Sequence, residues 1–274
     1  MGRTDGRRSG ELRPLHVTLG ELDRADGSGR FAFGPVAALA SFTGPIEVRL
    51  RDERVDRATL EVVHRPLEGV GSTASRALVT TLEAVFAPLL QLNAFPRSLC
   101  QIVVQSLSPA PPAWPKRVDT DESHAASWPP SAFPAVETDA APLGGSTFGS
   151  RAAAINAATL ASLHAGSNGL RAVPLAVAIA LVDDHTLVDP TAEEEAAARA
   201  RFGFGWAFGT GISGAGVRDS MDDGEVETEL VWAEAEGEFT RDEFNDARDE
   251  SLAAAREILD FAKDELEAFF ASRQ

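Results

Sequence analysis

Two residue periodicities alternate along this chain of 274 residues, and their order limits the folds that it can adopt. Apolar residues at every second position indicate strands, whereas apolar residues three and four positions apart indicate helices. From the N-terminus onward the predicted elements are strands over 16–47 and 59–64, a helix over 78–90, a strand over 101–107, a helix over 149–166, strands over 175–182, 186–188, 202–208 and 227–233, and a final helix. This order predicts a mixed α/β domain.

The last two helices carry the clearest local signals. Thr240 and Glu243 have the spacing of a capping box, which marks the start of a helix. The apolar stripe that follows steps by three and four residues along one face: Leu252, Ala255, Leu259, Ala262, Leu266 and Phe269. The helix over 149–166 is rich in alanine instead, and side chains this small let a helix lie close against a sheet.

The charge of the chain argues against one class of function. The formal net charge is −17, with acidic residues concentrated over 219–267 and arginines spread through the first half. A protein that binds nucleic acid by itself is usually basic, because neutralising phosphates supplies much of the affinity. We therefore expect weak RNA binding by the isolated chain, while a locally basic face stays compatible with this composition.

No segment has the features of a membrane anchor or of an exported protein. The apolar runs fall short of the roughly 18 residues that span a bilayer, and the charged first residues are not followed by the apolar core of a signal peptide. Cys100 is the only cysteine, so no intramolecular disulfide is possible, and it lies at the start of a predicted buried strand. This usage fits a reducing compartment such as the cytosol or nucleus.

Two segments differ in composition from the rest and are predicted to be loop insertions. Residues 108–147 are rich in Pro, Ala, Ser, Asp and Glu, and residues 209–225 are rich in Gly and Asp. Such compositions favour flexible surface segments, and we expect the first to be dispensable for assembly. Its two tryptophans, Trp114 and Trp128, either pack partly against the domain or serve as docking anchors.

Several short motifs together resemble one family. The start of the chain has Arg3-Thr4-Asp5-Gly6-Arg7, Glu11-Leu12-Arg13-Pro14 and Ala25-Asp26-Gly27-Ser28, and later pieces are Phe42-Thr43-Gly44-Pro45, Pro96-Arg97-Ser98, Ile155-Asn156-Ala157-Ala158-Thr159-Leu160 and Val188-Asp189-Pro190-Thr191. In this order and spacing they are similar to ribonuclease PH proteins, and within that family to the ring subunits of the eukaryotic RNA exosome. The resemblance covers nearly the whole chain except the two insertions.

The resemblance implies a fold and a set of partners. The implied fold is the ribonuclease PH fold, with two β-α-β units in a pseudo-symmetric sandwich, here as a single domain over 1–274. Six such subunits form a ring around a central RNA channel, and S1/KH proteins cap the ring. The implied partners are therefore other ring subunits, cap subunits and RNA in the channel, without a membrane, and the implied location is the nucleus, including the nucleolus, and the cytoplasm.

The resemblance also implies where a catalytic acidic pair would lie. Phosphorolytic members of the family have two aspartates six residues apart, and the matching positions here are Glu195 and Arg201. An arginine is always charged and cannot ligate a metal, so we expect no catalytic residue and no metal at this place. The neighbouring run Glu193-Glu194-Glu195 is typical of a solvated face. The five histidines show no spacing of metal ligands, and no cofactor is expected.

The residues that bind phosphate in enzymes of the family are only partly matched in this sequence. Family enzymes have Gly-Gly-Thr-Arg at the start of the second helix, and the matching piece is Phe148-Gly149-Ser150-Arg151. Free N–H groups at a helix start favour an anion, so Arg151 is a candidate contact for phosphate or RNA; alternatively, this is N-cap chemistry beside a surface arginine. A second family arginine is matched only loosely, by Arg76.

These observations favour a non-catalytic ring subunit of the RNA exosome. The alternatives are an active phosphate-dependent 3′-to-5′ exoribonuclease and an independent adaptor that uses its acidic insertions. A ring subunit is expected to be a hetero-oligomer and, at a net charge of −17, to prefer a more basic partner. Phe31 and Phe33 alternate on a predicted strand and are candidates for the core.

Overall fold

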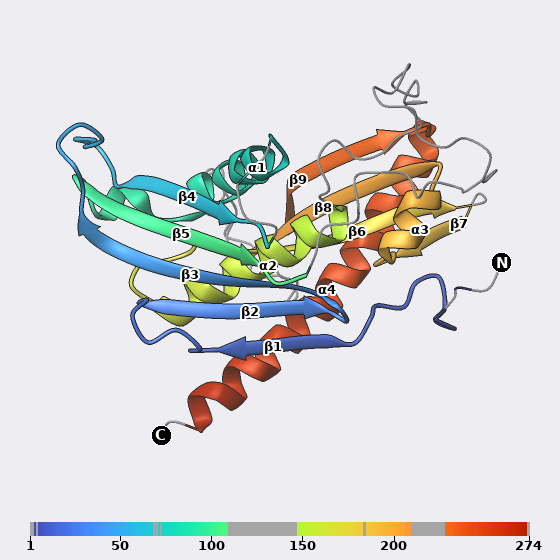
Figure 1. Cartoon of the computed structure of the whole chain (residues 1–274), viewed down its shortest axis with the longest axis horizontal. Coiled ribbons are helices and arrows are strands. Elements are labelled where there is room, and N and C mark those ends of the chain that lie inside the picture. The colour runs from blue at the N-terminus through green and yellow to red at the C-terminus, as the bar shows by residue number, and fades with distance from the viewer. Residues whose placement is uncertain are drawn as a thin grey trace, which may run out of the picture.

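A computed structural model of the chain describes residues 3, 5–67, 71, 73–108, 147–182, 185–209 and 228–272. Two sheets lie on either side of a central helix, α2 (Phe148–Ala165), as Figure 1 shows. The insertions predicted over 108–147 and 209–225 lie outside the described residues, apart from Ser108, Thr147 and Gly209. No helix in the described ranges is long and apolar enough to cross a membrane.

The first sheet has five strands in the order β1-β2-β3-β5-β4. Its strands are β1 (Leu15–Leu19), β2 (Gly27–Phe33), β3 (Val36–Glu47), β4 (Thr59–Arg65) and β5 (Ser98–Ser106). All neighbours are antiparallel except β4 and β5, which are parallel and therefore need a crossover. Helix α1 (Thr73–Leu89) and the short 3₁₀ helix η1 (Leu92–Ala94) make that connection, and α1 packs against β4.

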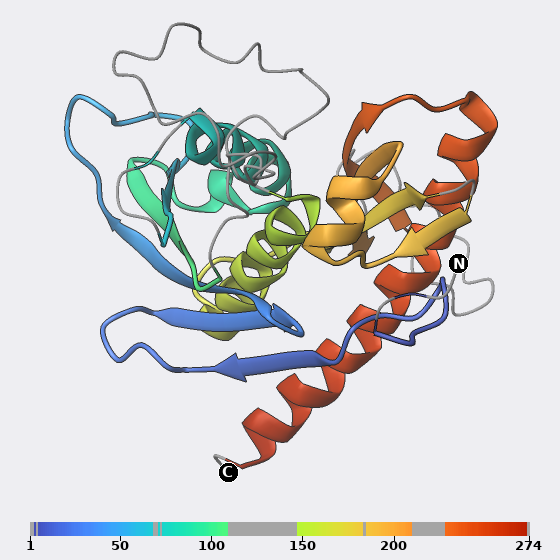
Figure 2. The ribbon, with the colours of Figure 1, turned by 45° about the vertical axis from the view of Figure 1, so that its right-hand side comes forward.

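The second sheet has four antiparallel strands in the order β7-β6-β8-β9. They are β6 (Ala172–Val182), β7 (His185–Val188), β8 (Ala200–Gly209) and β9 (Thr228–Gly237), with the short helix α3 (Ala192–Ala197) between β7 and β8. The long helix α4 (Arg241–Ala271) covers one face of this sheet and continues past β1 (Figures 1 and 2). Where α4 packs on the second sheet, the rings of Phe202 and Phe204 of β8 contact the ring of Phe244 of α4.

Helix α2 fits between the two sheets because most of its own residues are small. Thirteen of its eighteen residues are buried, and it packs on β2 and β3 on one side and on β6 and β8 on the other. Gly27 and Gly29 of β2 face its backbone, where any side chain would collide. Asn156 ties the helix to β6: its side-chain amide donates to Ala176 O at 3.0 Å, and its carbonyl oxygen accepts from Ala176 N at 2.7 Å.

Several predictions from the sequence are confirmed. The capping box of Thr240 and Glu243 begins α4. The helix predicted over 78–90 corresponds to α1, whose buried face includes Leu78, Leu82, Val85 and Leu89. Phe31 and Phe33 are fully buried, with ring centroids 4.9 Å apart. Cys100 is buried in β5, as its surroundings in the sequence indicate.

Gly27→Ala is expected to destabilise the fold. A Cβ at this position would lie 2.3 Å from the carbonyl oxygen of Ala161 and 2.4 Å from the nitrogen of Ala165, so α2 would have to move away from β2. Overpacking of this kind costs about 1–3 kcal/mol, which urea unfolding would measure. Gly10→Ala is the control, because a Cβ there meets no atom within 4 Å; equal midpoints for the two variants would contradict the prediction.

Candidate functional site

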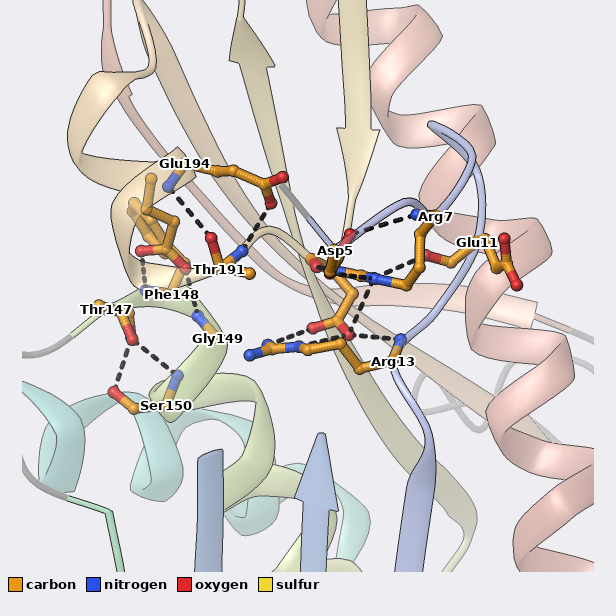
Figure 3. A network of polar contacts seen from close by, with 12 residues as sticks. Asp5, Arg7, Glu11, Arg13, Thr147, Phe148, Gly149, Ser150, Thr191 and Glu194 are labelled. Carbon is orange, nitrogen blue, oxygen red and sulfur yellow. Dashed lines mark hydrogen bonds and ion pairs between the residues drawn. The ribbon is translucent and has the colours of Figure 1, made fainter. Parts of the chain in front are cut away.

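The start of α2 is closed by a carboxyl group of the chain itself. Thr147 is the N-cap, and its hydroxyl accepts from Ser150 N at 3.1 Å. The next two backbone N–H groups both donate to Glu195: Phe148 N to Oε2 at 3.1 Å and Gly149 N to Oε1 at 2.9 Å. These are N–H groups that an α-helix leaves without internal partners. The carboxyl group of Glu195 therefore occupies the position at which the start of α2 could bind an anion. Figure 3 shows the hydrogen bonds at this helix start.

Helix α3 brings Glu195 to this position. Thr191 and Glu194 form a capping box that begins α3, and Glu194 also pairs with Arg3 at 3.1 Å. Glu195 comes one residue later and is only 2% exposed. The prediction that residues 193–195 form a solvated face is therefore wrong for Glu195. Its carboxyl satisfies two buried N–H groups, which outweighs the tendency of a glutamate run to remain in solvent.

A buried ion pair lies directly beside the capped helix end. Arg13 donates to Asp189 from Nε at 2.8 Å and from Nη2 at 2.5 Å, and its backbone N–H donates to the same carboxylate at 2.9 Å. Both side chains are buried. A Cβ placed on Gly149 would lie 3.5 Å from Nη2 of Arg13 and 3.3 Å from Oε1 of Glu195. The arginine, the glutamate and the start of α2 thus converge on one point, and Figure 3 shows Arg13 next to Gly149.

Two further arginines near this point are paired with neighbouring acids of β9. Arg201 of β8 forms an ion pair with Glu236, its partner across the strands, at 2.9 Å. Arg151 forms an ion pair with Glu234, and its guanidinium lies 5.3 Å from the centre of the Phe148 ring. Both arginine side chains are largely buried, with 7% and 13% exposure. Each of these cations therefore faces a carboxylate of the same chain.

Burial dominates the electrostatics of Glu195. It raises the pKa of this carboxyl to about 7, against the lowering effect of the N–H groups of Gly149 and Phe148 and of the charges on Arg201 and Arg13. Desolvation penalises the charged form of an acid, so the proton is held more tightly than in water. A pKa of about 7 places the change of charge of Glu195 near neutral pH.

The structure brings three of the four predicted site residues together. Glu195 contacts the start of α2, and Arg201 and Arg151 lie close by in ion pairs. Arg151 is not the surface arginine of the alternative interpretation, although the N-cap chemistry of that interpretation is present at Thr147. Arg76 is exposed in the first turn of α1, and in the described part of the chain no hydrogen bond or ion pair joins it to these groups.

Sequence reasoning did not assign a site role to four charged residues of this cluster. Arg13 and Asp189 lie within quoted family motifs, which is the signal that could have paired them. Glu234 and Glu236 alternate along β9, and nothing in that pattern distinguishes them from the solvated face of an edge strand. Their role becomes visible only when β8 and β9 are in register.

The comparisons with known proteins agree on one family. A family model described as "3' exoribonuclease family, domain 1" matches residues 11–168, and its "domain 2" matches residues 172–207. Exosome complex component RRP46 of Saccharomyces cerevisiae is 32% identical over 182 residues, which cover 66% of this chain and 68% of that protein. Exosome complex component Rrp41 of Archaeoglobus fulgidus is 25% identical over 96% of this chain and 85% of its own length.

Two solved structures have the same fold. The crystal structure of rice Rrp46 superposes with a TM-score of 0.71 and 21% sequence identity, covering 97% of this chain and all of the rice chain. A chain of an archaeal exosome core superposes with a TM-score of 0.64 and 15% identity, covering 96% of this chain and 91% of its own. At these identities the likeness establishes the fold alone. It confirms the mixed α/β architecture with two sheets around α2.

Glu195 is expected to make stability depend on pH. Its pKa is about 7 in the folded chain and 4.5 ordinarily, so the folded state keeps a proton that the unfolded chain loses above pH 4.5. Stability from this group is fully present below pH 4.5 and is lost as pH rises through 7, a change on the order of 3 kcal/mol.

Urea unfolding between pH 4.5 and 8 would measure this dependence in the wild type and in Glu195→Gln. The variant is expected to flatten the profile, because an amide does not titrate. Glu193→Gln, at an exposed position of the same helix, is the matched control and should leave the profile unchanged. An unaltered slope in Glu195→Gln would rule out this assignment.

Proposed function

The chain belongs to the 3′ exoribonuclease family of ribonuclease PH proteins, and from this premise we propose that it is a non-catalytic ring subunit of an RNA exosome. Support for the exosome comes from the likeness to RRP46 of Saccharomyces cerevisiae and to the rice Rrp46 structure. In this role the chain supports 3′-to-5′ RNA processing and decay, including rRNA processing, by building the wall of the RNA channel rather than by cleaving RNA.

The observation that carries the non-catalytic part is the closed start of α2. Cleavage by phosphate requires cationic groups and free N–H donors that hold the attacking phosphate. Here Glu195 takes the N–H groups of Phe148 and Gly149. A phosphate ion could enter only by expelling a buried carboxyl group from its two hydrogen bonds.

The surrounding arginines support the same conclusion. Arg13 is committed to Asp189, Arg151 to Glu234 and Arg201 to Glu236. Arg13 and Asp189 are both buried, and separating such a pair leaves an uncompensated charge, at a cost of about 3–5 kcal/mol. Glu234 and Glu236 are 35% and 41% exposed, so the other two pairs hold their arginines less strongly. Arg201 occupies the position where the family places the second acid, and it pairs with Glu236 of β9.

The proposed partners follow from the role in a ring. They are other ribonuclease-PH-like ring subunits, S1/KH cap subunits and RNA that passes through the assembled channel, in the nucleus, including the nucleolus, and the cytoplasm. A net charge of −17 makes strong RNA binding by the chain alone unfavourable. Affinity for RNA therefore depends on more basic surfaces that neighbouring subunits contribute to the channel.

The purified chain is expected to release no nucleoside diphosphates from 3′-labelled RNA in the presence of magnesium and inorganic phosphate. The reason is that the phosphate position is filled by Glu195 and that Arg201 replaces the second acid. Thin-layer chromatography of the products is the measurement. Phosphate-dependent release that Glu195→Gln abolishes would establish the alternative, an active 3′-to-5′ exoribonuclease, and would exclude a contaminating enzyme.

Assembly is tested separately, because a ring subunit must join other chains. Sedimentation of the protein, alone and mixed with the ribonuclease-PH-like ring subunits of its own organism, is expected to show a larger complex only in the mixture. A stable monomer that ignores every ring subunit over a range of salt concentrations would reject the ring role and favour an independent adaptor.

A further inference from the structure

The loop between β3 and β4, residues 48–58, exposes apolar side chains that the fold does not use. Leu50 is 90% exposed and Val55 is 72% exposed, the highest values for large apolar residues in the described ranges. Ile46, at the base of the loop, is 41% exposed. Figures 1 and 2 show this loop projecting from the end of the first sheet, away from α4. Single exposed apolar residues are common, but neighbouring ones on a projection mark an interaction surface.

The loop is held in shape by hydrogen bonds to the neighbouring chain segments. Asp52 N donates to Arg49 O at 2.8 Å in a turn, and the hydroxyl of Thr59 donates to Asp52 O at 2.7 Å. Arg97 N donates to Arg54 O at 3.0 Å, and Arg97 adopts a φ of 61°, which is unfavourable for a residue with a side chain. Leu50 and Val55 are thus presented by an ordered scaffold, which lowers the entropic cost of binding.

The charges of the loop favour a protein partner over RNA. Three arginines are neutralised locally, in the pairs Arg51–Asp52, Arg57–Asp56 and Arg97–Glu53. Arg49 and Arg54 form no ion pair within the residues that the structure describes. The loop therefore has two cations available to a binding partner, although the chain has a net charge of −17. RNA binding relies on many unpaired cations, whereas a protein interface combines an apolar core with a polar rim and is enriched in Arg.

We infer that the 48–58 loop docks into another protein subunit, in an apolar pocket that receives Leu50 and Val55 and whose rim supplies carboxylates to Arg49 and Arg54. The inference rests on the proposed function, because the partner is taken to be a subunit of the same assembly. Removing the two exposed aliphatic side chains from water would contribute to the affinity of this contact. The two arginines orient the loop and speed the encounter.

The test uses the full chain, co-expressed with the ribonuclease-PH-like ring subunits and the cap subunits of its organism. Leu50→Ser combined with Val55→Ser is expected to weaken incorporation into the complex at least tenfold, measured by the fraction that co-purifies with a tagged subunit and by titration of purified components. Phe270→Ser is the matched control, since Phe270 is 48% exposed at the end of α4. Equal urea midpoints for both variants would show that the fold is intact.

Each outcome separates the inference from the proposed function. A wild-type chain that joins none of these subunits overturns the proposed function and this inference together. Full incorporation of the double variant, with the wild type assembling normally, overturns the inference alone. It is also overturned if Arg49→Ala with Arg54→Ala weakens binding of a labelled oligouridine without changing incorporation, which would make the loop an RNA contact.

A photo-crosslinker at position 50 must label another subunit. Crosslinks only within the chain would overturn the inference, because they would show that the chain covers its own loop.

Discussion

The burial of α2 between two sheets is the constraint on which the rest of the structure depends. A helix in this position cannot expose its first N–H groups to water, and an unsatisfied buried N–H costs about 1–3 kcal/mol. Thr147 and Glu195 satisfy these donors from inside the chain. A bound oxyanion could satisfy them equally well. The carboxyl of Glu195 and an external anion are therefore alternative occupants of one position, and the fold needs one of them.

Because the carboxyl group of Glu195 caps α2, the charged residues around it must compensate one another. A buried acid at the start of α2 is tolerable because Arg13 and Arg201 lie close enough to lower its pKa, although desolvation remains the larger effect. Those arginines in turn need carboxylates, which Asp189 and Glu236 provide. The resulting network joins the N-terminal segment, α3 and both edges of the second sheet to the central helix. Within the described residues, this network pairs both Arg13 and Arg201 with carboxylates of the same chain.

The sequence was sufficient for local features and insufficient for contacts that depend on tertiary structure. The capping box at Thr240 and the helix over 78–90 depend on neighbours a few residues away, and both were predicted correctly. Glu195 was misjudged because its burial depends on where α2 begins, 47 residues earlier in the chain. Gly27 was noted only as part of a family motif, whereas it begins β2 and is needed for the close approach of α2. Neither the burial of Glu195 nor the need for a glycine at position 27 can be predicted from the spacing of nearby residues.

The closed site and the exposed loop have complementary consequences for a chain of this charge. Because Glu195 fills the start of α2, the proposed role of the chain depends on the surfaces that it presents to partners. The 48–58 loop presents aliphatic side chains to water, which in a neutral protein would favour self-association. A net charge of −17 opposes contact between two copies. Repulsion between copies, together with the two loop arginines that form no ion pair in the described part of the chain, therefore supports the inference of a different partner, one that offers carboxylates locally and a less acidic surface elsewhere.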